Sequence, residues 1–350
     1  MKEDHGISLW RVACASAMLA MGLAGVWGSK VNAQTASGEP APLKLTARPQ
    51  MTLRDVTGGV LHTRLQPPQN GIGKRLGASK ELAQVKKNAR RSNSGHGSGL
   101  AFYPGDLTYQ GGPVLQSVVS HNIYVNCTAS CFGNPGVFLT NWGNSGLMHV
   151  TDEFVGTHAS HRYTVGQGGI INYPVSGPLG PDDLVTLIYT AGAVFGTGYG
   201  DIYHIFFAPG IDVCQDAALT VCYSPDNLNT FYFCAFHGYA DFSDIGHVLF
   251  SIEPYANVEG CQVAQPSPNS AETDSQANTL SHELNEAITD PDLDAWWNAY
   301  DLALYGEENA DTCAQAFFDY TPTVLNGHAY EVQPAYSNQA HACAFKPFGD

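Results

Sequence analysis

The alternation of hydrophobic and polar positions predicts a series of short strands in the middle of the chain. β-Branched and aromatic residues concentrate in five runs, at residues 114–125, 183–190, 202–208, 229–236 and 247–253. Runs of this length and composition are typical of buried strands. Residues 137–154 instead contain helical stretches, which Gly143 and Gly146 interrupt.

The pattern changes at residues 274–290, where apolar residues form one face of a helix: Ala277, Leu280, Leu284, Ala287 and Ile288. Asp274 can cap the start of this helix, and Pro291 ends it, because the residue before a proline resists the α conformation. A short helical piece at 307–317 and a strand at 329–332 follow. This order predicts an α+β fold in a single domain, with a mixed sheet, a helix with a polar face and a small C-terminal lobe braced by disulfides.

Charge is distributed unevenly along the 350 residues. Residues 1–100 hold 14 Lys and Arg against 5 Asp and Glu, whereas residues 101–350 hold only Arg162 and Lys346 against 27 acidic residues. An acidic body with two basic side chains offers no groove for nucleic acid and no surface for an anionic membrane. The same composition suits acidic surroundings, where protonation reduces the self-repulsion of the negative charges.

The first 33 residues have the pattern of an export signal. Lys2 and Arg11 accompany an apolar run at 12–27, and small residues at 31–33 offer a cleavage site. The apolar run is short for a membrane-spanning helix. We therefore expect a secreted protein, extracellular or periplasmic, without a membrane anchor once the signal is removed. A signal anchor that is never cleaved is the alternative.

Residues 34–100 differ from the acidic domain expected at 101–350. They carry 11 Lys and Arg against 3 Asp and Glu, and they end in a Gly/Ser-rich stretch. This composition predicts a basic, largely disordered linker. The other interpretation is a pro-segment that shields the acidic domain until cleavage near Arg91.

Cysteine usage also favours export. Cys14 lies in the predicted signal, and eight cysteines follow, an even number that indicates disulfides in an exported chain. Proximity along the chain favours four pairs: Cys127–Cys131, Cys214–Cys222, Cys234–Cys261 and Cys313–Cys343. No CxxC pair occurs, which argues against zinc binding by cysteine.

The segment 281–290, SHELNEAITD, carries the strongest chemical signal. On a helix, His282 and Glu286 lie one turn apart and about 40° apart around the axis, so both can bind one metal ion. Glu283 lies about 100° from His282 and can take a proton from a water on that ion. HExxH helices likewise supply two metal ligands and a Glu that acts as general base, and here Glu286 replaces their second histidine.

A third metal ligand can come from residues 306–313. Glu308 lies 22 residues beyond Glu286, which lets a second element return to the helix. Asp311 can orient His282 from outside the ligand set, or bind the ion itself, and Asp290 is a further option at the end of the helix. Zinc is the expected ion, and the two carboxylates leave calcium or manganese open.

The motif HELNEAITD resembles the active helix of thermolysin-like zinc peptidases, over about 30 residues of this chain. That resemblance implies a zincin-like fold, a third ligand in the position of Glu308 and an outer acidic partner in the position of Asp311. The departure from the family is Glu286, where those peptidases have histidine.

A second resemblance covers nearly all of residues 110–345. The ordered segments GGPVL, FLTNWG, YHIFFAPG, FCAFHGY, HELNEAITDPDLDAW, GEENADTC and NGHAYEVQPAYSNQAHAC are similar to the secreted EXORDIUM-like, phosphate-induced protein family, in a bacterial form. The resemblance implies an extracellular location and a common fold. It implies no defined reaction, because the plant members are growth-related proteins without one.

These features predict a secreted, monomeric, metal-dependent hydrolase, most simply a zinc peptidase with Glu283 as general base and a peptide or cell-wall substrate. His237, at the end of a predicted strand, and His328 can each stabilise the developing oxyanion. The alternative is a non-catalytic extracellular protein associated with the cell wall or matrix, whose metal site only braces the fold.

Overall fold

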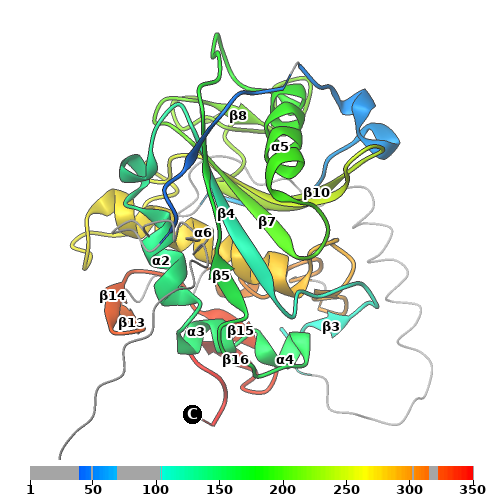
Figure 1. Ribbon diagram of the computed structural model, residues 1–350. Helices are drawn as coiled ribbons and strands as arrows, with labels where there is room; N and C mark the ends of the chain where they lie inside the picture. Colours follow the sequence, from blue (N-terminus) through cyan, green and yellow to red (C-terminus); the bar gives the residue numbers. More distant parts are fainter. Residues whose placement is uncertain are drawn as a thin grey trace, which may run out of the picture. The chain divides into compact units, whose positions relative to one another are not determined.

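A mixed eight-stranded sheet forms the centre of the fold (Figure 1). Its strands, in order across the sheet, are β1 (Leu43–Leu45), β6 (Gly169–Ile171), β4 (Val118–Val125), β7 (Asp201–Phe207), β11 (Gly246–Glu253), β10 (Ala235–Phe242) and β2 (His62–Gln66), and β5 (Tyr163–Val165) pairs with the start of β4. Neighbours are parallel from β1 to β11 and antiparallel from β11 to β2. The fold is therefore α+β with a mixed sheet, as the sequence predicts.

The structure is a computed structural model that describes residues 39–48, 50–68, 103, 105–301, 303–314 and 322–349. These residues belong to one compact unit. The predicted signal and the expected cleavage position near Arg91 lie outside the described residues. No helix of the described part is long and apolar enough to span a membrane.

Helices cover the two faces of the sheet. Helix α5 (Pro181–Phe195) packs on one face, and α6 (Ala271–Thr289) lies on the other with α2 (Pro135–Trp142) (Figure 1). Successive strand residues point to opposite faces. In β7, Tyr203 and Ile205 therefore pack in the core under α5, whereas Ile202 and Phe206 pack in the core under α6.

Shorter elements complete the fold. The described residues contain four 3-10 helices: η1 (Leu53–Asp55), η2 (Thr57–Gly59), η3 (Ala129–Phe132) and η4 (Asp311–Cys313). They also contain two short α-helices, α3 (Gly146–His149) and α4 (Asp152–Val155). Four two-stranded pairs are β3 (Thr108–Tyr109) with β12 (Trp296–Trp297), β8 (Val213–Cys214) with β9 (Cys222–Tyr223), β13 (Thr323–Leu325) with β14 (His328–Tyr330), and β15 (Ala335–Ser337) with β16 (Ala342–Ala344). The last two pairs form the expected C-terminal lobe.

Residues 183–190 and most of residues 229–236, predicted as strands, are not strands in the structure. Residues 183–190 belong to α5, because Pro181 suits the first helical turn and the Gly180 N–H donates to Asp183 Oδ2 (2.9 Å). The apolar run there is buried helix, which periodicity alone does not separate from strand. Of the run 229–236, only the end is strand, since β10 begins at Ala235.

The predicted helix at 274–290 is confirmed, and it begins earlier than the apolar pattern indicates. The structure starts α6 at Ala271, with Ser270 as its N-cap residue. Asp274 is not the cap. Its carboxylate accepts hydrogen bonds from the backbone N–H groups of Asn269 (2.9 Å) and Glu331 (3.2 Å), which ties the helix to the C-terminal lobe.

Part of the segment predicted as a disordered linker is ordered. Residues 39–68 contribute β1 and β2 to opposite edges of the sheet. Gly238 allows β2 to lie against β10, because a side chain at Gly238 would collide with the backbone carbonyl of His62. Backbone pairing to existing edge strands stabilises this segment in spite of its polar composition.

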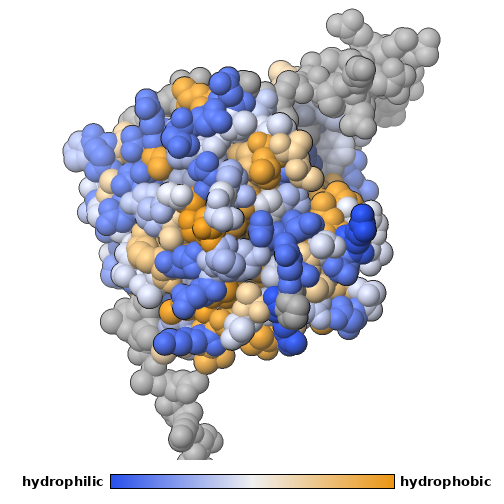
Figure 2. Space-filling view, turned by 90° about the horizontal axis from the view of Figure 1, so that it is seen from above, coloured by the Kyte–Doolittle hydropathy of each residue, from blue (hydrophilic) through white to orange (hydrophobic). Residues whose placement is uncertain are grey.

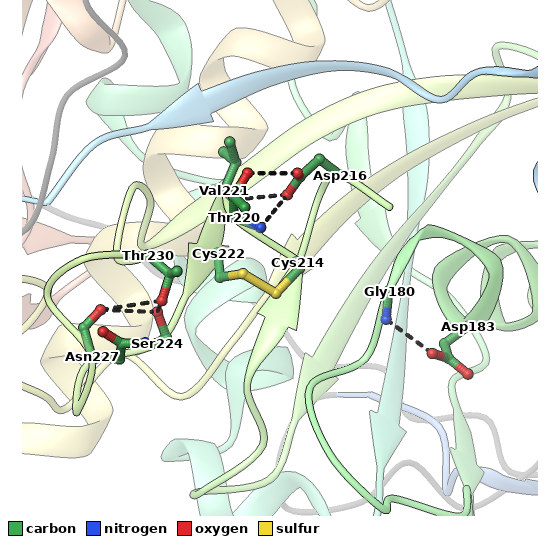
Figure 3. Close-up of a disulfide and its surroundings, with 10 residues drawn as sticks. All are labelled: Gly180, Asp183, Cys214, Asp216, Thr220, Val221, Cys222, Ser224, Asn227 and Thr230. Carbon is green, nitrogen blue, oxygen red and sulfur yellow. Dashed lines mark hydrogen bonds between the residues drawn. A yellow bond between two sulfur atoms is a disulfide. The ribbon is translucent and has the colours of Figure 1, made fainter. Parts of the chain in front are cut away.

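The four cysteine pairs favoured by proximity are the four disulfides of the structure. Figure 3 shows Cys214–Cys222, which joins β8 to β9. Asp216 closes the intervening turn by accepting the backbone N–H groups of Thr220 (2.8 Å) and Val221 (2.7 Å). Four disulfides fit an extracellular protein.

The face of the molecule seen from above carries no single dominant apolar patch. Figure 2 shows hydrophilic residues on this side interspersed with small hydrophobic patches. Such a mixed surface is ordinary for a folded protein in water.

Candidate metal centre

Helix α6 is buried on its polar side as well as on its apolar side. Its residues are buried from Asp274 to Thr289, and His282, Glu283 and Glu286 have exposed fractions of 1% or less. The polar side is therefore enclosed by other parts of the protein. It is covered by β10, β2 and the segment of Glu308, which all present polar groups to it.

The sheet presents a row of polar side chains to α6. The register pairs Asn122 with His204, His204 with Ser251, Ser251 with His237, and His237 with Arg64, so the row crosses five strands. The first four of these residues are buried. Because side chains alternate along a strand, the whole row lies on the side of α6.

His282 has one ring nitrogen held from outside and the other turned toward carboxylates. Nδ1 lies 3.2 Å from Gln333 Oε1, and Gln333 Nε2 donates to the Ala310 carbonyl (2.8 Å), which fixes the orientation of the amide. The amide oxygen accepts, so Nδ1 carries the proton. Nε2 lies 3.1 Å from Glu286 Oε1 and 3.6 Å from Asp311 Oδ1. Metal-binding histidines are held in this way.

His237 lies among the other carboxylates of the cluster. Its Nδ1 is 3.2 Å from Glu283 Oε2 and 3.6 Å from Glu286 Oε2, and its Nε2 is 3.8 Å from Glu308 Oε1. The sequence predicts that His237 stabilises a developing oxyanion, whereas its position in the structure makes it a possible metal ligand. It supplies, from β10, the second imidazole that the helix motif lacks.

The ligand-type atoms form two groups of three, and the atoms of each group lie within 4.8 Å of one another. The first group is His282, Glu286 and Asp311, and the second is His237, Glu286 and Glu308. Glu286 belongs to both. The set expected from the sequence, His282 with Glu286 and Glu308, is divided between the two groups. Asp311, considered as an outer partner of His282, faces the free nitrogen of that ring.

Arg64 and Asp290 lie beside the second group. Arg64 Nε is 3.3 Å from Glu308 Oε2. Burial lowers the pKa of Arg64, but the negative charges of Glu308, Asp311 and Asp290 outweigh it and raise that pKa. Asp290 accepts the backbone N–H of Ala295 (2.6 Å) and does not belong to either group of ligands.

Burial dominates the electrostatics of the cluster. It raises the pKa values of Glu283 and Glu308 well above their usual range and lowers that of His237 to about 3. Burial also opposes a charge on His282, yet the carboxylates of Glu286 and Asp311 raise its pKa. Within the described residues, some buried atoms of the cluster have no hydrogen-bond partner, among them His237 Nε2, Glu283 Oε1 and Glu308 Oε1. Unpartnered buried polar atoms are costly, and a metal ion satisfies such atoms.

His328 lies apart from the cluster. It is exposed on β14, where it pairs with Leu325 across the hairpin. Among the described residues it makes no hydrogen bond or ion pair with the groups around α6. The structure therefore brings His237 to the site and leaves His328 outside it.

Two site residues escaped the sequence reasoning. Arg64 lies in the segment interpreted as a linker, and only the pairing of β2 with β10 brings it to Glu308. Gln333 follows directly after the predicted strand 329–332. Its burial, at an exposed fraction of 1%, is seen only in the structure, so the sequence offers no signal for it.

A chain of hydrogen bonds extends the polar row beneath α6. His204 Nε2 lies 3.1 Å from Ser120 Oγ and its Nδ1 2.8 Å from Ser251 Oγ, and the Ser251 hydroxyl donates to Glu253 Oε1 (2.9 Å). Burial raises the pKa of Glu253 to about 8 and lowers that of His204 to about 3. Both groups are thus neutral at pH 7, as their depth requires.

No protein-family model, curated protein or solved structure matches the chain. The family resemblances rest on the sequence motifs alone.

Proposed function

We propose that the protein binds a divalent metal ion between His282, Glu286 and Asp311 and uses it to hydrolyse a substrate, most simply a peptide, outside the cell. The observation that carries the proposal is the ring of His282, with Nδ1 directed at Gln333 and Nε2 at two carboxylates. One imidazole and two carboxylates suit zinc, with manganese or calcium as the alternatives.

Glu283 is proposed as the general base. When bound, a divalent ion acidifies water and polarises a carbonyl. Glu283 Oε2 is directed at His237 Nδ1 (3.2 Å), while Glu283 Oε1 has no hydrogen-bond partner in the described part of the chain. Burial raises the pKa of Glu283, and the positive charge of a bound cation would lower it, so that this oxygen could then accept a proton and pass it to a leaving amine. His237 holds the carboxylate in place for this transfer.

Asp311 is the most exposed of the three proposed ligands. The Asp311 side chain is 13% exposed, whereas those of His282 and Glu286 are 1% exposed or less. The zincin-like fold, the export and the peptide substrate are parts of the proposal that the motif HELNEAITD, the export-signal pattern and the four disulfides support.

A second candidate function is a structural metal site in a non-catalytic extracellular protein. The burial of α6 favours it, because a bracing ion needs no open position and a catalytic ion does. The EXORDIUM-like resemblance is compatible with either function.

Incubation of the purified protein with a proteome-derived peptide library, at acidic and at neutral pH, separates the two candidates. The hydrolase predicts cleavage that a chelator abolishes and that Glu283→Gln reduces by about 100-fold to 10,000-fold. Glu272→Gln, the same substitution at the start of the same helix, is the matched control and keeps full activity. If the protein binds metal but shows no chelator-sensitive cleavage, the hydrolase is rejected and the structural metal site is kept.

A further inference from the structure

We propose that this centre takes two divalent cations, bridged by the carboxylate of Glu286. The inference rests on the proposed function for the first cation, held with His282 and Asp311. It adds a second site, made by His237, Glu286 and Glu308.

The two oxygens of Glu286 are directed at different histidines. Oε1 lies 3.1 Å from His282 Nε2, and Oε2 lies 3.6 Å from His237 Nδ1. The backbone N–H of Asp311 donates to Oε1 (2.9 Å), which fixes the orientation of the carboxylate. His237 Nδ1 is closer to Glu283 Oε2 (3.2 Å), so the ring offers Nε2 to a cation. One ligand atom each of His237, Glu286 and Glu308 lies within 4.8 Å of the others, and Glu286 belongs to both groups, so its two oxygens can bind one cation each.

The second site has its own buried ligands. Glu308 Oε1 lies 3.8 Å from His237 Nε2, while Arg64 Nε lies 3.3 Å from Glu308 Oε2. The guanidinium therefore orients Glu308 and leaves Oε1 directed at the histidine. The side chains of His237 and Glu308 have an exposed fraction of 0%, and neither His237 Nε2 nor Glu308 Oε1 has a hydrogen-bond partner among the described residues.

Counting metal ions in the full chain tests the inference. The protein is equilibrated with zinc, dialysed, and analysed by mass spectrometry of the elements. We expect two zinc ions per chain in the unchanged protein and in His328→Ala, whose exposed histidine is the matched control. We expect one in His237→Ala and one in His282→Ala, with folding checked by circular dichroism.

A second measurement keeps the test decisive if a variant fails to fold. In the unchanged protein loaded with manganese, electron paramagnetic resonance should show an exchange-coupled pair, because one carboxylate bridges the ions. One zinc per chain, retained in His237→Ala, together with an uncoupled six-line manganese signal, would overturn the second site and leave the proposed function standing. No stoichiometric metal at all would overturn both.

Discussion

The two faces of the central sheet share the same strands and each has an apolar core, but the α6 face also holds a row of buried polar side chains. On the α5 side, alternate strand residues such as Ile205, Phe236 and Phe250 pack against the helix in a continuous apolar core. On the α6 side, the residues next to them in sequence include His204, His237 and Ser251, all buried. Both faces stabilise the fold through apolar burial, and the α6 face also holds polar groups that stability alone does not require.

Removing a large side chain on the α5 face should give the largest change in stability. Leu187→Ala leaves a cavity at a fully buried position, which should lower the free energy of unfolding by about 2–5 kcal/mol. Urea denaturation with and without a chelator measures the effect. We expect the same loss in both conditions, because no metal ligand is involved. A loss that vanishes in chelator would show that the two faces are not independent.

Removing the metal should lower the stability of the α6 face and leave that of the α5 face unchanged. At free metal about 100-fold above its dissociation constant, binding should add about 2.7 kcal/mol to the free energy of unfolding. Hydrogen exchange with and without a chelator should show lost protection in α6, β10 and the segment of Glu308, and little change in α5. Equal loss of protection in both helices would contradict this division of the molecule.

Gln333 offers a smaller and more specific change. Gln333→Leu keeps the size of the side chain but removes the acceptor for His282 Nδ1, which should weaken metal binding about 10-fold to 100-fold. Competition with a zinc indicator measures the affinity. Gln339→Leu, a glutamine near the C-terminus, serves as the control. Unchanged affinity in Gln333→Leu would mean that the amide does not position the histidine.

A pH dependence is also expected from the α6 face. Burial raises the pKa of Glu253 from 4.5 to about 8, so the folded state keeps a proton that the unfolded state has lost. Stability from this group is complete below pH 4.5 and is lost as pH rises through about 8. With metal chelated, Glu253→Gln should lose less stability across this range than the unchanged protein, whereas exposed Glu259→Gln should follow the unchanged protein.

The sequence predicts α6, β7 and β11 well, because their apolar periodicity is strong and each is buried where the pattern says. It fails at α5, whose apolar residues at 183–190 have the composition of a strand. It also fails at β2, because pairing to a distant edge leaves no local signal.

The candidate site shows the same limit. His282, Glu283 and Glu286 are predictable, since their spacing along one helix fixes their geometry. Glu308 and Asp311 lie on a loop, and their neighbours depend on how this loop returns to α6. Spacing along the sequence does not decide whether Glu308 or Asp311 faces His282. His237 is recognisable as a histidine in a buried strand, but only the register of β10 places it opposite Arg64 and near Glu286.

The most direct test of a metal centre on the α6 face is anomalous diffraction from crystals of the protein grown with zinc. Data collected on both sides of the zinc absorption edge locate the ion without any assumption about function. We predict an anomalous peak between His282 Nε2, Glu286 and Asp311, lost in His282→Ala crystals. The metal centre would be contradicted if zinc peaks occurred only at surface sites and the buried carboxylates were paired to each other through protons.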